Sequence, residues 1–197
     1  VCILFQEKWG RDFIAATREI CREIQEKMKE VMGIDVSMGI GDWVKSPDKL
    51  LLSHDMAAQA MEYRYLLGGK LLIDMAEHKD IPPVPIDQLL DRFTAALKTG
   101  NGEIVEKMVR EMKDSIRRGF VEKSRACMYL QQIVRTMDRV CEDVSADMAC
   151  VQEGRDELLR QITEQKSFDS ACRLVEDHIG KVFKILSDMN SSSEEKQ

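Results

Sequence analysis

Apolar residues recur at helical spacing along most of this chain, and the pattern is most regular in its second half. Between residues 168 and 189, apolar side chains follow one another at alternating steps of four and three. The same steps run from Leu130 to Met148. This spacing is typical of coiled coils and of helical bundles. The helix that contains the steps from Leu130 to Met148 is predicted near 122–148, and shorter helices are predicted near 86–98 and 103–118. A weaker helix carries Leu158, Leu159 and Ile162. The pattern therefore predicts an all-α helical bundle over residues 86–190.

The last predicted helix begins at Ser167, a residue type that caps helix N-termini. Its apolar stripe is either a packing face within one chain or an interface with a second copy, since both use the same spacing. We expect Val175→Asp or Ile179→Asp to disrupt packing or association. The candidate residues for helix packing or a dimer interface are Phe168, Cys172, Val175, Ile179, Val182 and Leu186.

The first third of the chain combines strand and helix patterns. Apolar residues at 1–6 predict a buried strand, alternation over 34–44 predicts a second, and 71–73 predicts a third. Two predicted helices separate them: one over 11–32, and one that starts at the Ser46-Pro47 cap and ends at Leu67. Residues 1–76 thus predict a β-α-β-α-β unit, and because the apolar run begins at Val1, we expect it to be the second half of a larger α/β domain.

Glycine and proline mark the other features of the chain. Gly39 and Gly41, within the second predicted strand, indicate a place where another element packs close to the backbone. Three of the four prolines lie in 77–85, which predicts an extended linker. Residues 191–197 are polar and predict a disordered tail. The expected fold class is therefore α+β: a partial α/β unit followed by a helical bundle.

Composition narrows the classes of function. The net charge of −6 argues against a nucleic-acid surface on these residues. A basic cluster between Arg110 and Arg125 is interrupted by carboxylates, which favours a solvated helix face. None of the six cysteines forms a C-x-x-C pair, and no apolar run approaches the length of a membrane span. We expect reduced cysteines, no metal, no cofactor, no membrane contact and a cytoplasmic location.

No arrangement of residues predicts catalysis. The glycines lack the context of a phosphate-binding loop. His54 and Asp55 resemble an acid–base pair, but adjacent residues on a helix are not expected to face each other. The sequence therefore predicts no catalytic residue.

Two stretches nevertheless carry a family resemblance. The segment Ser37-Met38-Gly39-Ile40-Gly41 resembles the S-x-G-I-G strand of the GGDEF, or diguanylate cyclase-like, fold, and residues 50–62 resemble the helix that follows it. Asp55 and Ala57 match that helix. Glu62 stands where the family carries a lysine that helps to hold nucleotide phosphate, and this reversal of charge would repel a triphosphate. The resemblance implies a degenerate, non-catalytic GGDEF-like unit.

A wider resemblance extends over about residues 1–190. The S-x-G-I-G strand, the stretch Tyr63-Arg64-Tyr65-Leu66-Leu67-Gly68, the proline-rich join and the helix after Gly100-Asn101 together resemble one kind of AraC-type transcriptional regulator. The resemblance implies a bacterial two-component response regulator, in which this region connects an upstream receiver or sensor to a C-terminal helix-turn-helix DNA-binding domain. It implies self-association through the last helix, with DNA bound only by a domain absent from this chain. The alternatives are a fragment of a diguanylate cyclase-like signalling enzyme and a small-ligand sensor.

Overall fold

The computed structural model describes the backbone of residues 2–3, 13–69, 71–78, 81–144 and 154–194. It describes their side chains as well, except those of Val144 and residues 185–194. The chain divides into two compact units, Val1–Ile81 and Pro82–Gln197. The division falls within the proline-rich segment 77–85, and each unit has its own set of internal contacts.

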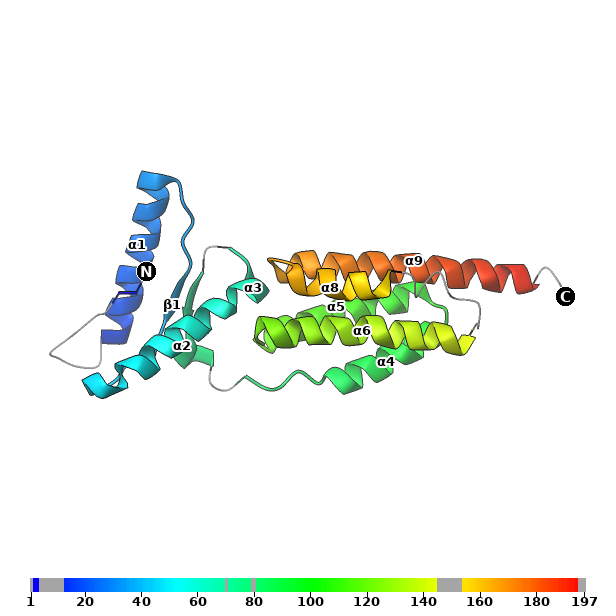
Figure 1. The fold of residues 1–197 in the computed structure, drawn as a ribbon, viewed down its shortest axis with the longest axis horizontal. Helices are drawn as coiled ribbons and strands as arrows, with labels where there is room; N and C mark the ends of the chain where they lie inside the picture. Colours follow the sequence, from blue (N-terminus) through cyan, green and yellow to red (C-terminus); the bar gives the residue numbers. More distant parts are fainter. Residues whose placement is uncertain (1, 4–12, 70, 79–80, 145–153, 195–197) are drawn as a thin grey trace. The chain divides into compact units, whose positions relative to one another are not determined.

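The first unit places helices against a small parallel sheet (Figure 1). Strands β1 and β2 pair in parallel, with Met38 opposite Leu72. Helix α1 contacts β2, and α2 contacts both strands. The elements are α1 (Phe13–Met32), β1 (Met38–Ile40), the 3-10 turn η1 (Pro47–Lys49), α2 (Leu50–Glu62), α3 (Arg64–Leu67), β2 (Leu72–Asp74) and the 3-10 turn η2 (Met75–His78). With the helices of the second unit, the chain is α+β in the broad sense.

The predicted strand 71–73 is present as β2, with its bounds moved by one residue, whereas the strand predicted over 34–44 is much shorter. Only Met38–Ile40 of the predicted strand 34–44 is a strand, because β2 supplies ladder partners for those three residues alone. Cys2 and Ile3 are exposed and lie outside any strand, so the predicted buried strand 1–6 is wrong at these two positions. The rest of that segment lies outside the described residues.

The helix predicted from the Ser46 cap to Leu67 is also divided. Pro47 opens a 3-10 turn, and the Ser46 side chain makes no capping hydrogen bond. A short break at Tyr63 separates α2 from α3, and Gly68, with a φ of 81°, ends α3. A left-handed φ of this kind is open to glycine at little cost, which explains why the chain can turn here towards β2.

Polar side chains fix α1 to the sheet. Gln25 is buried, and its Nε2 donates to the carbonyl oxygens of Val36 and Leu71, at 2.8 and 2.9 Å. The guanidinium of Arg18 donates to the buried Asp74 carboxylate through Nε at 2.8 Å and pairs with Glu77 at 2.7 Å. The Asp74 hydrogen bond is the main reason that the pKa of Arg18 is raised. These bonds satisfy groups that burial would otherwise leave unpaired.

The second unit is a helical bundle (Figure 1). Helix α6 contacts α4, α8 and α9, while α9 also contacts α5 and α8. The predicted cap at Ser167 forms, because its hydroxyl accepts from Ser170 N at 3.2 Å. The Asn101 side chain forms a second cap, which was not predicted from the sequence, by accepting from Ile104 N at 3.2 Å. The helices are α4 (Ile86–Lys98), α5 (Gly102–Arg118), α6 (Lys123–Val144), α8 (Arg155–Glu164) and α9 (Phe168–Glu194).

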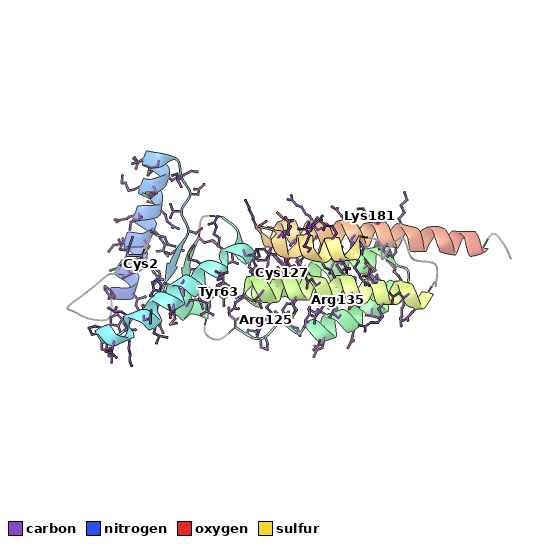
Figure 2. The ribbon with its side chains drawn as sticks, viewed as in Figure 1. Cys2, Tyr63, Arg125, Cys127, Arg135 and Lys181 are labelled. Carbon is purple, nitrogen blue, oxygen red and sulfur yellow. The ribbon has the colours of Figure 1, made fainter. Side chains whose placement is uncertain are left out.

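Four of the described cysteines lie in the interiors of these units. Cys21, Cys127, Cys141 and Cys172 are buried and free, whereas Cys2 is exposed and free. Figure 2 labels Cys2 in the first unit and Cys127 on α6. Cys150 lies outside the described residues. Within the described part of the chain, no helix is both long and apolar enough to cross a membrane.

Candidate functional site

Helix α9 carries the residues that the sequence singles out, and the structure places them inside the bundle. Phe168, Cys172, Val175, Ile179 and Val182 are all buried, with Val175 only 1% exposed. The side chain of Leu186 lies outside the described residues. Packing within one chain is enough to explain why these five positions are apolar. A dimer interface through α9 stays a prediction, and it would have to use positions that the bundle does not cover.

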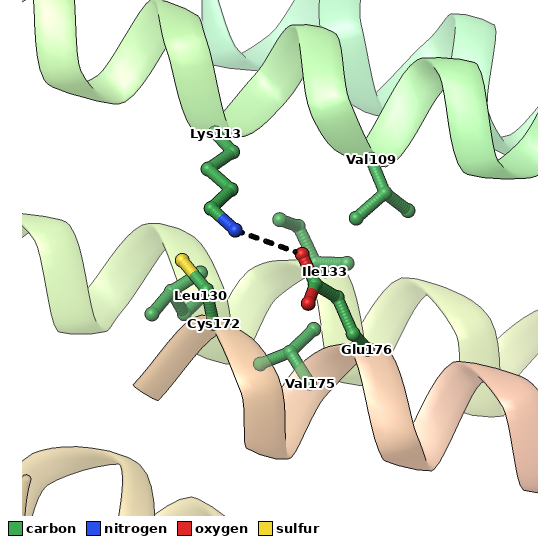
Figure 3. Close-up of a pocket in the computed structure, with 7 residues that line it drawn as sticks. All are labelled: Val109, Lys113, Leu130, Ile133, Cys172, Val175 and Glu176. Carbon is green, nitrogen blue, oxygen red and sulfur yellow. Dashed lines mark hydrogen bonds and ion pairs between the residues drawn. The ribbon is translucent and has the colours of Figure 1, made fainter. Parts of the chain in front are cut away.

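A small pocket lies where α9 meets α5 and α6 (Figure 3). Its space is sufficient for about one water molecule. A charged pair closes one side of it, because the Lys113 ammonium lies 3.0 Å from the Glu176 carboxylate. The lining residues are Val109, Lys113, Leu130, Ile133, Cys172, Val175 and Glu176. At this size the pocket is a packing imperfection beside an ion pair, with no room for a nucleotide.

Two ion pairs fix the position of α9 along α5. Lys113 pairs with Glu176, and Arg117 pairs with Asp169, two turns earlier on α9. The Arg117 guanidinium also lies over the ring of Phe168, 5.7 Å from its centroid, which is within range of a cation–π interaction. Since both pairs join the same two helices, they define one register of α9 against α5.

A buried carboxylate lies where α6, α8 and α9 meet. Asp138 is 3% exposed, and its Oδ1 lies 3.5 Å from His178 Nε2 on α9. Its Oδ2 has no hydrogen-bond partner and lies 3.9 Å from Arg155 on α8. A buried carboxylate with one unsatisfied oxygen carries a desolvation cost that its neighbours offset only in part. Movement of α8 or α9 would therefore change the free energy of this cluster by more than it would change the free energy of a purely apolar contact.

Burial also makes the cysteine thiols of the bundle inert. The pKa of Cys172 is raised to about 12, chiefly by burial, and that of Cys141 to about 11 by burial and by the carboxylates of Asp138 and Glu142. Thiols with such pKa values hold almost no thiolate near neutral pH, so they are not candidate nucleophiles.

We predict that Cys172 and Cys141 resist alkylation in the native protein while Cys2 reacts. At pH 8, a thiol whose pKa is about 12 instead of 9.0 holds roughly 1,000-fold less thiolate. Iodoacetamide labelling followed by mass spectrometry measures each site, and labelling in denaturant is the control. Labelling of Cys172 as fast as Cys2 would contradict the burial of Cys172 in the bundle.

The same pKa values predict how the stability of the bundle depends on pH. Because the unfolded thiols ionise near pH 9 and the folded ones do not, we expect the free energy of unfolding to fall as the pH rises from 9 towards 12.

The interrupted basic cluster is largely engaged within the protein. Arg110 pairs with Glu106, Lys113 with Glu176 and Arg117 with Asp169, while Arg118 donates to the carbonyl oxygen of Asp114. These pairings use the cations for helix–helix and within-helix contacts.

The residues behind the GGDEF resemblance lie on α2, on β1 and directly beside β1. Gly39 and Gly41 lie against α2, as the sequence indicates: an added Cβ would overlap the carbonyl oxygens of Ala57 and Ser53, respectively. Glu62 is exposed at the end of α2. The expectation that His54 and Asp55 would not meet is wrong, because His54 Nδ1 lies 3.2 Å from Asp55 Oδ1. Both side chains are more than half exposed, however, and the contact has no oriented third group beside it among the described residues.

The polar contacts that fix α9 were not predicted from the sequence. Asp138, Glu176 and Lys113 each follow a buried apolar residue in the chain, and His178 precedes one. Charged residues that flank an apolar stripe correspond to the positions at which neighbouring helices form ion pairs. That position is the signal that could have identified them, although the partner helix of each one depends on the bundle topology.

Comparison with known proteins adds no family assignment. No family model, no curated protein and no solved structure matches this chain. Among the described residues, no group of three or more histidine, cysteine or acidic side chains is placed to hold a metal ion.

Proposed function

We propose that this chain is a non-catalytic, signal-transmitting region of a bacterial AraC-type transcriptional regulator of the two-component kind. In this proposal, it links an upstream receiver or sensor to a C-terminal helix-turn-helix domain that this chain does not contain. The degenerate GGDEF-like unit acts as a scaffold, and the helical bundle passes the signal on in the cytoplasm. The sequence resemblance supplies the family, and the arrangement around α9 supplies a physical route for the signal.

The observation that carries the proposal is the mixed character of the α9 packing. An apolar seam gives α9 its stability, while ion pairs with α5 and the buried Asp138 cluster define its position. In this proposal, α9 also has a second position in which those pairs are exchanged or broken. An upstream signal that favours one position over the other would move the C-terminal end of α9 and so change the geometry of a dimer.

Glu62 supports a non-catalytic interpretation of the first unit. It is exposed on α2 where the resemblance expects a phosphate-holding lysine. A carboxylate repels the phosphates of a nucleotide, so the position works against triphosphate binding. The cyclase and small-ligand alternatives both require a ligand to bind this chain or its parent.

The proposal is tested by sequencing the complete reading frame on both sides of this chain. We expect a receiver or sensor before Val1 and a pair of helix-turn-helix motifs after Gln197. An intact GGDEF hairpin before Val1 with a stop codon after Gln197 would replace the proposal with the signalling-enzyme alternative. Thermal denaturation of the chain with millimolar GTP and cyclic di-GMP distinguishes the ligand sensor, for which the midpoint would rise.

A further inference from the structure

The outward face of α6 carries an uninterrupted basic stripe. Helical geometry aligns Arg125, Met128, Gln132, Arg135 and Arg139 on one side, at steps of three and four residues. The opposite side of the helix, from Ala126 to Cys141, is buried in the bundle. The three arginines are exposed, and Figure 2 labels Arg125 and Arg135 on α6. We call these five residues the α6 stripe.

The arginines of the α6 stripe differ from most other arginines in the described parts of the chain. Arg92, Arg117 and Arg160 each form an ion pair with a carboxylate on the same or a neighbouring helix. None of the three α6 arginines has an ion-pair partner within the described residues. Between Lys123 and Met137 the helix contains no acidic residue at all. Exposed acidic residues flank only the two ends of the stripe, at Glu122, Glu142 and Asp143, so its centre is available to an external anion on a chain of net charge −6.

Helix α8, on one flank, does not neutralise the stripe. The Gln131 side chain, beside it, donates to the carbonyl oxygen of Leu159, which places α8 along one flank. The α8 carboxylates Glu157 and Glu164 are both paired with Arg160. Hydrogen bonds to Arg160 and Gln161 lower the pKa of Glu157 to about 2, so it stays ionised and committed to that pair.

One further feature of the stripe indicates a protein partner. Met128 is 45% exposed at its centre, and an exposed methionine offers an adaptable apolar contact. A polyphosphate would use the arginines alone, whereas an acidic helix with an apolar residue uses the arginines and Met128 together.

We propose that the α6 stripe is the docking site for an acidic amphipathic helix of another protein. Arg125 and Arg139 are about 21 Å apart along the helix axis, at 1.5 Å per residue, so a partner helix of about four turns would cover the stripe. The carboxylates of the partner helix pair with the guanidinium groups, which bind carboxylates in a planar, bidentate geometry. An apolar residue of the partner lies on Met128. The inference is separate from the proposed function and does not depend on it.

The test measures binding of a fluorescent helical peptide of about 20 residues, with glutamate and leucine at amphipathic spacing, to the whole chain at low salt. The variant carries Arg125→Gln, Arg135→Gln and Arg139→Gln. The matched control carries Arg22→Gln, Arg64→Gln and Arg173→Gln, which remove three exposed arginines elsewhere with the same change in net charge. Glutamine is a good helix former, so both proteins should retain the native circular dichroism spectrum.

We expect the stripe variant to bind the peptide at least about tenfold more weakly and the control variant within about twofold of the native chain. Met128→Gln should weaken binding by about threefold without changing its salt dependence. The peptide with glutamine in place of glutamate should not bind. The inference is overturned if the native chain does not bind the acidic peptide or if both triple variants weaken binding equally. It is also overturned if a duplex DNA of about 20 base pairs binds more tightly than the peptide through the same three arginines.

Discussion

Replacing Val175 with aspartate should unfold the helical bundle and leave the α/β unit folded. Val175 is 1% exposed on the inner face of α9, and it lines the small pocket beside Leu130 and Ile133. The cation that shares this pocket, Lys113, is already paired with Glu176, so a carboxylate at position 175 has no free partner and is buried without compensation or forces the helices apart. We expect the free energy of unfolding of the bundle to fall by about 4 kcal/mol, a loss large enough to unfold many domains.

Hydrogen exchange measured by mass spectrometry is the appropriate readout, because it monitors peptides of each unit separately. Peptides of α5, α6 and α9 should lose protection, while peptides of α1 and α2 keep theirs. The control is Gly180→Asp, which adds the same charge to an exposed position of the same helix with no atom near the new Cβ. This control should leave the free energy of unfolding of the bundle within about 0.5 kcal/mol of the native value.

Sedimentation of the same variants separates the two interpretations of the α9 stripe. Val175→Asp could leave hydrogen-exchange protection unchanged and halve the mass of an assembled form. In that case the stripe is an interface between copies, and its packing within one chain does not determine the stability of the bundle. Loss of protection at unchanged mass in a monomeric protein assigns the stripe to the core. Ile179→Asp, at a position that is 7% exposed, should behave in the same way with a smaller effect.

The helices could be predicted from the sequence because each carries its own signals. The end of α1 is an example: Gly33 has a φ of 68° and donates to the Lys29 carbonyl oxygen at 3.0 Å, as expected of a glycine just past a helix. The α9 stripe and its Ser167 cap are equally local. Helix ends, caps and apolar stripes are determined by residues three or four positions apart in the sequence, so they do not depend on the rest of the fold.

The strands and the polar contacts could not be predicted to the same degree, because their partners are distant in the chain. The length of β1 depends on β2, more than thirty residues later in the chain, and the alternating pattern of 34–44 does not contain that information. Asp138 contacts His178, which is forty residues later in the chain, and Arg18 binds Asp74, which is fifty-six residues later. Sequence spacing places each group on a helix face, but only the packing of the helices determines which groups meet.

Gly41→Ala should destabilise the first unit, and the comparison with Gly69→Ala isolates the cause. Gly41 follows β1, and a Cβ at this position would overlap the carbonyl carbon and oxygen of Ser53 on α2. The obstacle is helix backbone, which cannot rotate away as a side chain could, so α2 must move off the sheet. We expect the free energy of unfolding of this unit to fall by about 3 kcal/mol. Peptides of α1 and α2 should then exchange faster, with those of α9 unchanged.

Gly69 is the matched site because a Cβ there meets no atom within 4 Å, and it is not among the described glycines with positive φ. Gly69→Ala should therefore leave the first unit unchanged or stabilise it by about 0.5 kcal/mol, through the smaller entropy of the unfolded chain. Equal losses from the two substitutions would show that glycine flexibility matters at both positions and that α2 does not lie against Gly41. A loss confined to Gly41→Ala ties the S-x-G-I-G pattern to a helix that packs directly on the strand, independently of any ligand.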